Sequence, residues 1–182
     1  GSADAAPHGH VSTRRNADEE IVVENEHVTL PFDNATNLLS AMVDRTNGTT
    51  VSVSQHYLKY ASHTSGQASG AYIFRPNGDA TELPLTGGVA QTEVVEGPIV
   101  TEVRQTIGTL VRQTLRLLHG LDWLEGAAVD VAATIGPLPV DNEIIVLFDT
   151  DLTTNREFFT DNNGLEMQRR TYLPGGRTGD PD

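Results

Sequence analysis

The chain has 182 residues, enough for one ordinary domain, and its hydrophobic content of 37% is compatible with a packed core rather than wholesale disorder. Its 25 acidic residues outnumber 12 basic ones, and the formal net charge of −13 argues against nucleic acid and anionic membranes as partners, because both attract basic surfaces. The chain has no cysteine, which excludes disulfides and thiolate metal sites.

The acidic surplus leaves two explanations open. It either keeps the surface soluble, or it suits an acidic compartment in which partial protonation of carboxylates lowers the net charge. No apolar run has the length of a transmembrane helix, and no signal peptide is visible. The start at Gly1-Ser2, without a methionine, is typical of a cloning scar, so we expect an excised piece of a longer protein.

Apart from its two ends, the chain shows mainly the period-two alternation of strands. Residues 1–20 lack this pattern and predict a disordered arm, while the Gly-, Pro- and Asp-rich residues 174–182 predict a flexible tail. Asn47-Gly48 is a strong hairpin signal. Short strands with such turns predict a mainly β fold, an antiparallel β-sandwich over residues 21–173. The alternating apolar groups are Val28, Leu30 and Phe32; Val51 and Val53; Val129, Val131, Ala133 and Ile135; and Ile144, Val146 and Phe148.

One stretch fits a helix as well as strands. The residues that would mark one side of a helix are Val103, Ile107, Leu110, Val111, Leu115 and Leu118. The same stretch also alternates, and its threonines are better strand formers than helix formers. Gly108 weakens both readings. We favour strands.

No metal site is predicted. His8 and His10 could ligate a metal, but they lie in the expected arm without a further ligand nearby. Asp161-Asn162-Asn163-Gly164 faintly resembles a calcium loop, yet the acidic residue required at the twelfth EF-hand position is missing, so a turn on Asn163-Gly164 is favoured. The motifs GxSxG, GxGxxG and HExxH and the phosphate-binding P-loop are absent. A Ser/His/Asp triad, which assembles in space, stays open although nothing local favours one.

Two further features concern carbohydrate. Asn34 and Asn47 each begin an Asn-x-Thr acceptor in a predicted turn, where an attached glycan would stand in solvent. Sugar sites also use aromatic rings, and four residues are candidates, although such residues are more often packing residues: Tyr57, Tyr60, Tyr72 and Trp123. Tyr72 is the strongest, because it follows the small residues Ala68-Ser69-Gly70-Ala71, which allow close approach of backbone or ligand.

The segment around Tyr72 carries a family resemblance. Residues 69–77, SGAYIFRPN, resemble a segment of the glycoside hydrolase family 38 α-mannosidases, especially the lysosomal type. Further matching segments follow in the family's order over about residues 21–173, whereas residues 83–96 match poorly. These segments are Gly97–Val103, Gln113–Leu117, Gly136–Val140, Glu143–Thr150, Phe158–Gly164 and Arg169-Arg170.

The resemblance implies a galactose mutarotase-like supersandwich, incomplete as a fragment. Family members are retaining enzymes that remove α-linked mannose from oligosaccharides, with a zinc ion and an aspartate nucleophile in an N-terminal domain. This chain resembles only the β region after that domain, so it is expected to hold no catalytic residue and no metal, and to be inactive alone. The resemblance gives Tyr72 a substrate-binding role at the rim of the sugar pocket. It also implies a lysosomal or similar acidic compartment for the parent protein.

Three functional readings follow. In the first, the domain scaffolds the catalytic domain of an α-mannosidase and lends Tyr72 to the mannose pocket, so that its partners are the rest of that chain and a mannose-containing oligosaccharide. In the second, it is a stand-alone carbohydrate-binding module. In the third, it is a structural interaction domain. Excising part of a sandwich leaves unpaired strand edges and apolar patches, so the fragment is also expected to self-associate.

Overall fold

The structure is a computed structural model that describes residues 12–15, 21–173 and 177–179. The chain divides after Thr150 into two compact units. The strands after Thr150 belong to a unit of their own, so the β-sandwich domain expected over residues 21–173 extends over both units. None of the helices among the described residues has the length and apolarity needed to cross a bilayer.

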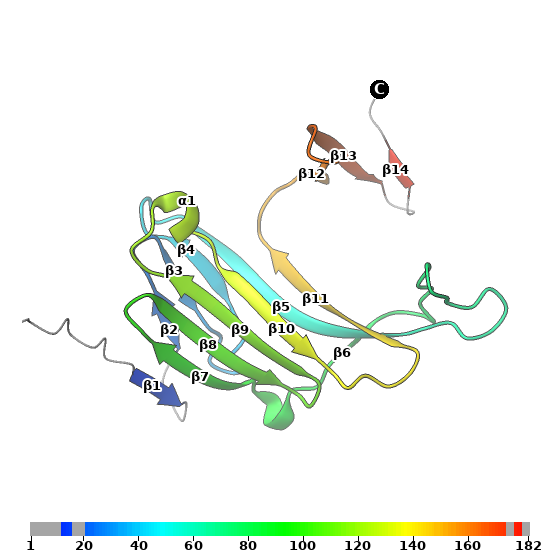
Figure 1. The fold of residues 1–182 in the computed structure, drawn as a ribbon, viewed down its shortest axis with the longest axis horizontal. Helices are drawn as coiled ribbons and strands as arrows, with labels where there is room; N and C mark the ends of the chain where they lie inside the picture. Colours follow the sequence, from blue (N-terminus) through cyan, green and yellow to red (C-terminus); the bar gives the residue numbers. More distant parts are fainter. Residues whose placement is uncertain (1–11, 16–20, 174–176, 180–182) are drawn as a thin grey trace, which may run out of the picture. The chain divides into compact units, whose positions relative to one another are not determined.

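The first unit is built from two antiparallel sheets (Figure 1). The first sheet runs in the order β1 (Ser12–Arg15), β7 (Gln91–Glu96), β8 (Val100–Ile107), β9 (Val111–Leu118) and β10 (Asp130–Ile135). The second runs in the order β11 (Asn142–Thr150), β5 (Thr50–Ala61), β4 (Ala41–Asp44), β3 (Val28–Pro31) and β2 (Val22–Glu24), with β6 (Thr81–Glu82) paired to β5. Two single turns of helix complete the unit: η1 (Thr86–Gly88) and α1 (Trp123–Gly126).

Alternation along the strands creates the core between these sheets. In β8 and β9 every second residue is buried, among them Val103 and Leu115, which are paired across the ladder. They pack in one apolar cluster with Val28 and Leu30 of β3, which comes from the other sheet. The expected antiparallel sandwich is confirmed.

Residues 100–118, which fit either a helix or strands in sequence, form a β-hairpin. β8 and β9 pair along their whole length from Val100–Leu118 to Ile107–Val111. Gly108 lies in the connecting turn with φ +58°, a conformation that residues with a side chain rarely adopt. The strand reading is therefore correct, and Gly108 marks the turn. The hairpin predicted at Asn47-Gly48 is likewise present, between β4 and β5.

A polar cluster is buried among the apolar residues of the core. The Gln113 carbonyl Oε1 accepts hydrogen bonds from Gln55 Nε2 at 2.8 Å and from the Tyr57 hydroxyl at 2.7 Å. Gln113 Nε2 donates to Gln105 Oε1 at 2.5 Å, and Gln105 in turn donates to the Asn37 carbonyl. Since Gln55 and Tyr57 belong to β5 and the other two glutamines to β8 and β9, the cluster ties the two sheets together.

Strands β10 and β11 are edge strands of the two sheets and are less covered than the rest. Val131 and Ile135 pair with buried residues of β9, so they point toward the core side, yet they are 38% and 40% exposed. Val146 and Phe148 pair with buried Tyr57 and Gln55 in the same way and are 43% and 40% exposed. We call these four side chains the open edge.

The second unit is a small sheet, and burial is described for its residues 151–173. β12 (Glu157–Asp161), β13 (Met167–Leu173) and β14 (Arg177–Gly179) pair in that order, antiparallel. The turn predicted on Asn163-Gly164 lies between β12 and β13, and the Gly164 N–H donates to both Asp161 carboxylate oxygens at 2.8 and 3.0 Å. None of residues 151–173 is buried, so this sheet lacks a core of its own.

Two short strands fall in the segments expected to have no regular structure. β1 (Ser12–Arg15) pairs with β7, and β14 (Arg177–Gly179) pairs with β13. The other residues of the expected arm and tail, including His8 and His10, lie outside the described residues.

Candidate functional site

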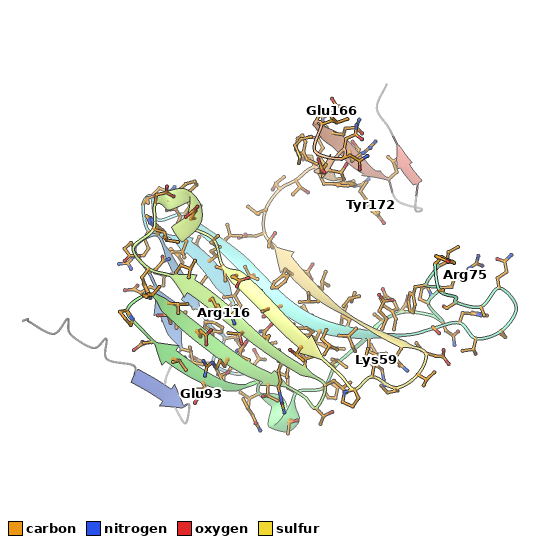
Figure 2. The ribbon with its side chains drawn as sticks, in the orientation of Figure 1. Lys59, Arg75, Glu93, Arg116, Glu166 and Tyr172 are labelled. Atoms are coloured by element: carbon orange, nitrogen blue, oxygen red, sulfur yellow. The ribbon has the colours of Figure 1, made fainter. Side chains whose placement is uncertain are left out.

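Tyr72 lies in the loop between β5 and β6, which projects from the sandwich (Figure 1). Figure 2 labels Arg75 in this loop and Lys59 on the strand from which the loop leaves. The loop is closed at its base by backbone hydrogen bonds: Asn77 N–H donates to the Ala61 carbonyl at 2.8 Å, and His63 N–H to the Arg75 carbonyl at 2.7 Å. We call residues 62–80 the Tyr72 loop.

Inside the loop, the Ser69 side chain bonds backbone groups that have no strand partner. Ser69 Oγ donates to the Arg75 carbonyl and accepts from the Arg75 N–H, both at 2.9 Å. Gly70 N–H donates to the Ile73 carbonyl at 3.0 Å, which folds the chain tightly around residues 71 and 72. The Arg75 guanidinium donates to Gln67 Oε1 across the loop. These bonds hold the loop tip without a hydrophobic core.

An aromatic contact connects the loop to the sheet. The rings of Phe74 and Tyr60 meet edge to face, with centroids 6.2 Å apart and an interplanar angle of 66°. Phe74 therefore anchors one side of the tip to β5. The Tyr72 side chain at the tip is 100% exposed, so both faces of its ring and its hydroxyl are open to a ligand. A phenol in this setting can stack on the apolar face of a sugar and hydrogen-bond a hydroxyl.

The other aromatic candidates have different surroundings. Tyr57 is buried, burial raises the pKa of its hydroxyl, and that hydroxyl donates to Gln113. Tyr60 is half-buried against Phe74. Trp123 is 53% exposed but belongs to α1, which follows β9 rather than the Tyr72 loop. The structure thus brings Tyr60 and the Tyr72 loop together, and gives Tyr57 a packing role.

A row of three polar side chains lies beside the base of the loop, and the sequence does not single it out. Ser54 Oγ lies 2.8 Å from His56 Nε2, and Glu82 Oε1 lies 2.8 Å from His56 Nδ1. The order of contacts is that of a Ser–His–carboxylate triad. However, the N–H groups of β5 lie in the plane of its sheet, and Asp149 stands across the ladder from Ser54. A substrate carbonyl attacked by Ser54 would develop its oxyanion near a carboxylate instead of N–H donors, so acyl transfer is not supported.

Both candidate glycosylation sites lie on exposed turns. Asn34 follows Asp33, whose carboxylate accepts hydrogen bonds from the Thr36 hydroxyl at 2.8 Å and from the Ala35 N–H at 3.0 Å. Asn47 lies in the β4–β5 turn, where its Nδ2 donates to Asp44 Oδ2 at 3.0 Å. Asn34 and Asn47 remain candidates.

The described residues do not form a metal site. Nowhere among them do three or more histidine or carboxylate side chains converge around a common point. The carboxylate of Asp161 instead receives the Gly164 N–H in a turn, as favoured from the sequence. A zinc ion such as the family resemblance implies therefore finds no ligand set in the described part of this chain.

Comparison with known proteins decides the family. Residues 23–175 match the family model described as the glycosyl hydrolases family 38 C-terminal domain. The chain belongs to this family. It is 37% identical to human lysosomal alpha-mannosidase over 171 residues, 88% of this chain and 16% of that protein. It is 34% identical to the alpha-mannosidase of Canavalia ensiformis over 149 residues, 78% of this chain and 15% of that one.

The family 38 C-terminal domain match confirms the resemblance carried by residues 69–77 and the segments after it. A relative from Dictyostelium discoideum, named lysosomal alpha-mannosidase, is 29% identical over 176 residues. The chain spans only 17% of that relative's length, so most of each relative has no counterpart here.

Proposed function

We propose that this chain is a non-catalytic β domain of a retaining α-mannosidase, which scaffolds the catalytic domain and lends Tyr72 to the sugar pocket. The family 38 C-terminal domain match carries the proposal, together with the full exposure of Tyr72 on a braced loop. Because several relatives are named lysosomal alpha-mannosidase, the parent enzyme is assigned to the lysosome, with terminal α-linked mannose in oligosaccharides as its substrate. Zinc and the reacting carboxylates belong to other parts of the parent chain.

The scaffold role is supported by the open edge and the second unit. Apolar side chains that point toward the core side of β10 and β11 are about two-fifths exposed, and none of residues 151–173 is buried. Both features are expected of surfaces that pack against another part of a protein. The partner in this proposal is the rest of the α-mannosidase chain.

The role of Tyr72 is tested in the full enzyme. Tyr72→Phe removes one hydroxyl that hydrogen-bonds the sugar, so kcat/KM for an aryl α-mannoside should fall by about five- to tenfold while the melting temperature stays unchanged. Tyr172→Phe, at a tyrosine 55% exposed in the second unit, is the matched control and should leave both unchanged. Unchanged kinetics in Tyr72→Phe, or equal losses of stability and turnover, would refute the sugar contact.

The second candidate, a stand-alone carbohydrate-binding module, is favoured only by the exposed phenol of Tyr72. Calorimetry of this 182-residue chain with mannose distinguishes the two. Binding at millimolar or tighter affinity would favour the module, and absence of binding favours the scaffold, in which most of the pocket is supplied by other residues.

Two further expectations accompany the scaffold. The chain alone should self-associate through its open edge, which sedimentation at increasing concentration would show as a rising mean mass; a monomer throughout would count against it. In the parent, Asn34 and Asn47 should carry glycans, checked by the mass lost from each peptide on treatment with an endoglycosidase.

A further inference from the structure

The return of the Tyr72 loop to the sheet is short. Its last strand, β6, has only two residues, which pair with Leu58 and Lys59 of β5, and the Leu83 N–H then donates to the Tyr57 carbonyl at 2.8 Å. So few ladder bonds hold a segment weakly. Glu82 adds a side-chain contact to this strand, because its carboxylate reaches His56 on β5 at 2.8 Å. We infer that Ser54, His56 and Glu82 form a clasp that tightens when His56 is protonated and fixes the Tyr72 loop, which makes His56 and Glu82 positioning residues for Tyr72.

The hydrogen-bond geometry suits both protonation states of the imidazole. In the neutral ring, Nδ1–H donates to the Glu82 carboxylate and Nε2 accepts from the Ser54 hydroxyl. In the protonated ring, both nitrogens donate, and Ser54 Oγ becomes the acceptor, since a hydroxyl can take either part. The contacts therefore persist on protonation, while the Nδ1–Oε1 bond changes from one between a neutral donor and a carboxylate to an ion pair.

The charged groups near His56 can be assigned to one face of the sheet. On the same face of the sheet, the β11 residues are Glu143, Leu147 and Asp149, which stand across the ladder from Tyr60, His56 and Ser54. From β6 the facing charge is Glu82 itself. β4 contributes Ala41, opposite Ser52, to this face. Lys59 belongs to the alternate set of β5 residues and points to the opposite face. The charged side chain in contact with His56 is therefore Glu82.

The exposure of the His56–Glu82 pair limits how strongly it can hold the base of the loop. The His56 and Glu82 side chains are 32% and 62% exposed, and ion pairs as open as this one are weak. The clasp should therefore change the opening equilibrium of the loop base by about two- to fivefold, not by orders of magnitude. Its consequence for sugar binding rests on the proposed role of Tyr72, whereas its effect on the loop does not.

Amide hydrogen exchange of the 182-residue chain tests the clasp. Protection factors of the Leu83 and Asn77 amides, which close the loop base, are compared between wild type and Glu82→Gln at about pH 5 and about pH 7.5. Glutamine keeps an acceptor for Nδ1–H but has no charge. The ratio of wild type to variant should be near one at the higher pH and about two to five at the lower pH. His56→Gln should abolish that dependence on pH.

Three comparisons complete the test. Glu143→Gln removes a carboxylate from the same sheet face and should give the same ratio at both pH values. Protection of Val103 in β8 reports on the whole sandwich and should not change in any variant. A ratio for Glu82→Gln that is the same at both pH values, or one that Val103 shares, overturns the clasp. A pH-dependent ratio combined with unchanged kinetics of Tyr72→Phe in the full enzyme would uphold the clasp and refute only the proposed sugar contact.

Discussion

Replacing Gln113 should destabilise the sandwich by more than the loss of one hydrogen bond, because its side chain bonds several buried groups. Gln113 is buried between the sheets and bonds to Gln55, Gln105 and Tyr57 at once. Gln113→Leu keeps a side chain of similar length but removes both the acceptor and the donor. Four partner groups then lose a hydrogen bond in the buried core: the amide N–H and the carbonyl of Gln55, the Tyr57 hydroxyl and the Gln105 carbonyl.

The magnitude follows from the cost of unpaired buried polar groups. Each such group costs about 1–3 kcal/mol, and the neighbouring amides can re-pair in part, so we expect a loss of about 2–5 kcal/mol in the free energy of unfolding. Tyr57→Phe leaves the Gln113 carbonyl still bonded to Gln55 and should cost only about 1 kcal/mol. In the Gln113→Leu background the Tyr57 hydroxyl is already unpaired, so removing it should be neutral or stabilising.

Urea unfolding followed by far-ultraviolet circular dichroism measures all four proteins of this double-mutant cycle. Gln91→Leu, at an exposed glutamine of β7, is the control for the change in residue type and should shift the free energy by less than about 0.5 kcal/mol. If Tyr57→Phe is as destabilising in the Gln113→Leu background as in wild type, the cluster does not act as one unit and the reasoning is refuted.

Two further predictions concern the first sheet and its turns. Hydrogen bonds from Arg116 and then Arg104 hold the pKa of Glu102 below its ordinary value of 4.5, so the stability they give is present above about pH 4.5 and is lost as the pH falls through the lower, folded-state pKa. Glu102→Gln should therefore be destabilised relative to wild type at about pH 6, and the difference should shrink toward about pH 3; a constant difference would contradict it. Gly108→Ala should cost more stability than Gly48→Ala, although both glycines have positive φ. At position 108 the new Cβ would lie 2.7 Å from the backbone oxygen of Pro84, whereas at position 48 it would lie in open space. Equal shifts in melting temperature for the two variants would argue against this steric effect.

The sequence predicts the sheets better than the site. Alternation located β8, β9 and the β4–β5 hairpin because burial on one face leaves a period of two in the chain. Alternation also placed Gln113 in the same series as Val111 and Leu115, but it did not reveal the hydrogen bonds that join Gln113 to β5. The clasp was not visible either: Glu82 is 26 residues from His56, and only the pairing of β6 with β5 brings them together.

Strands β10 and β11 show what alternation actually records. The sequence of β10 alternates as clearly as that of β9, which predicts one buried face, yet every residue of β10 is exposed. The side chains do point the way that the alternation predicts. Val131 and Ile135 pair with buried Leu115 and Val111 and face the core side. What is missing is a covering layer. Since an apolar stripe that stays in water gains no free energy from burial, its presence is best explained by a partner surface, and the same explanation serves Val146 and Phe148. Under the scaffold proposal, the open edge is the part of the chain that the rest of the parent enzyme covers.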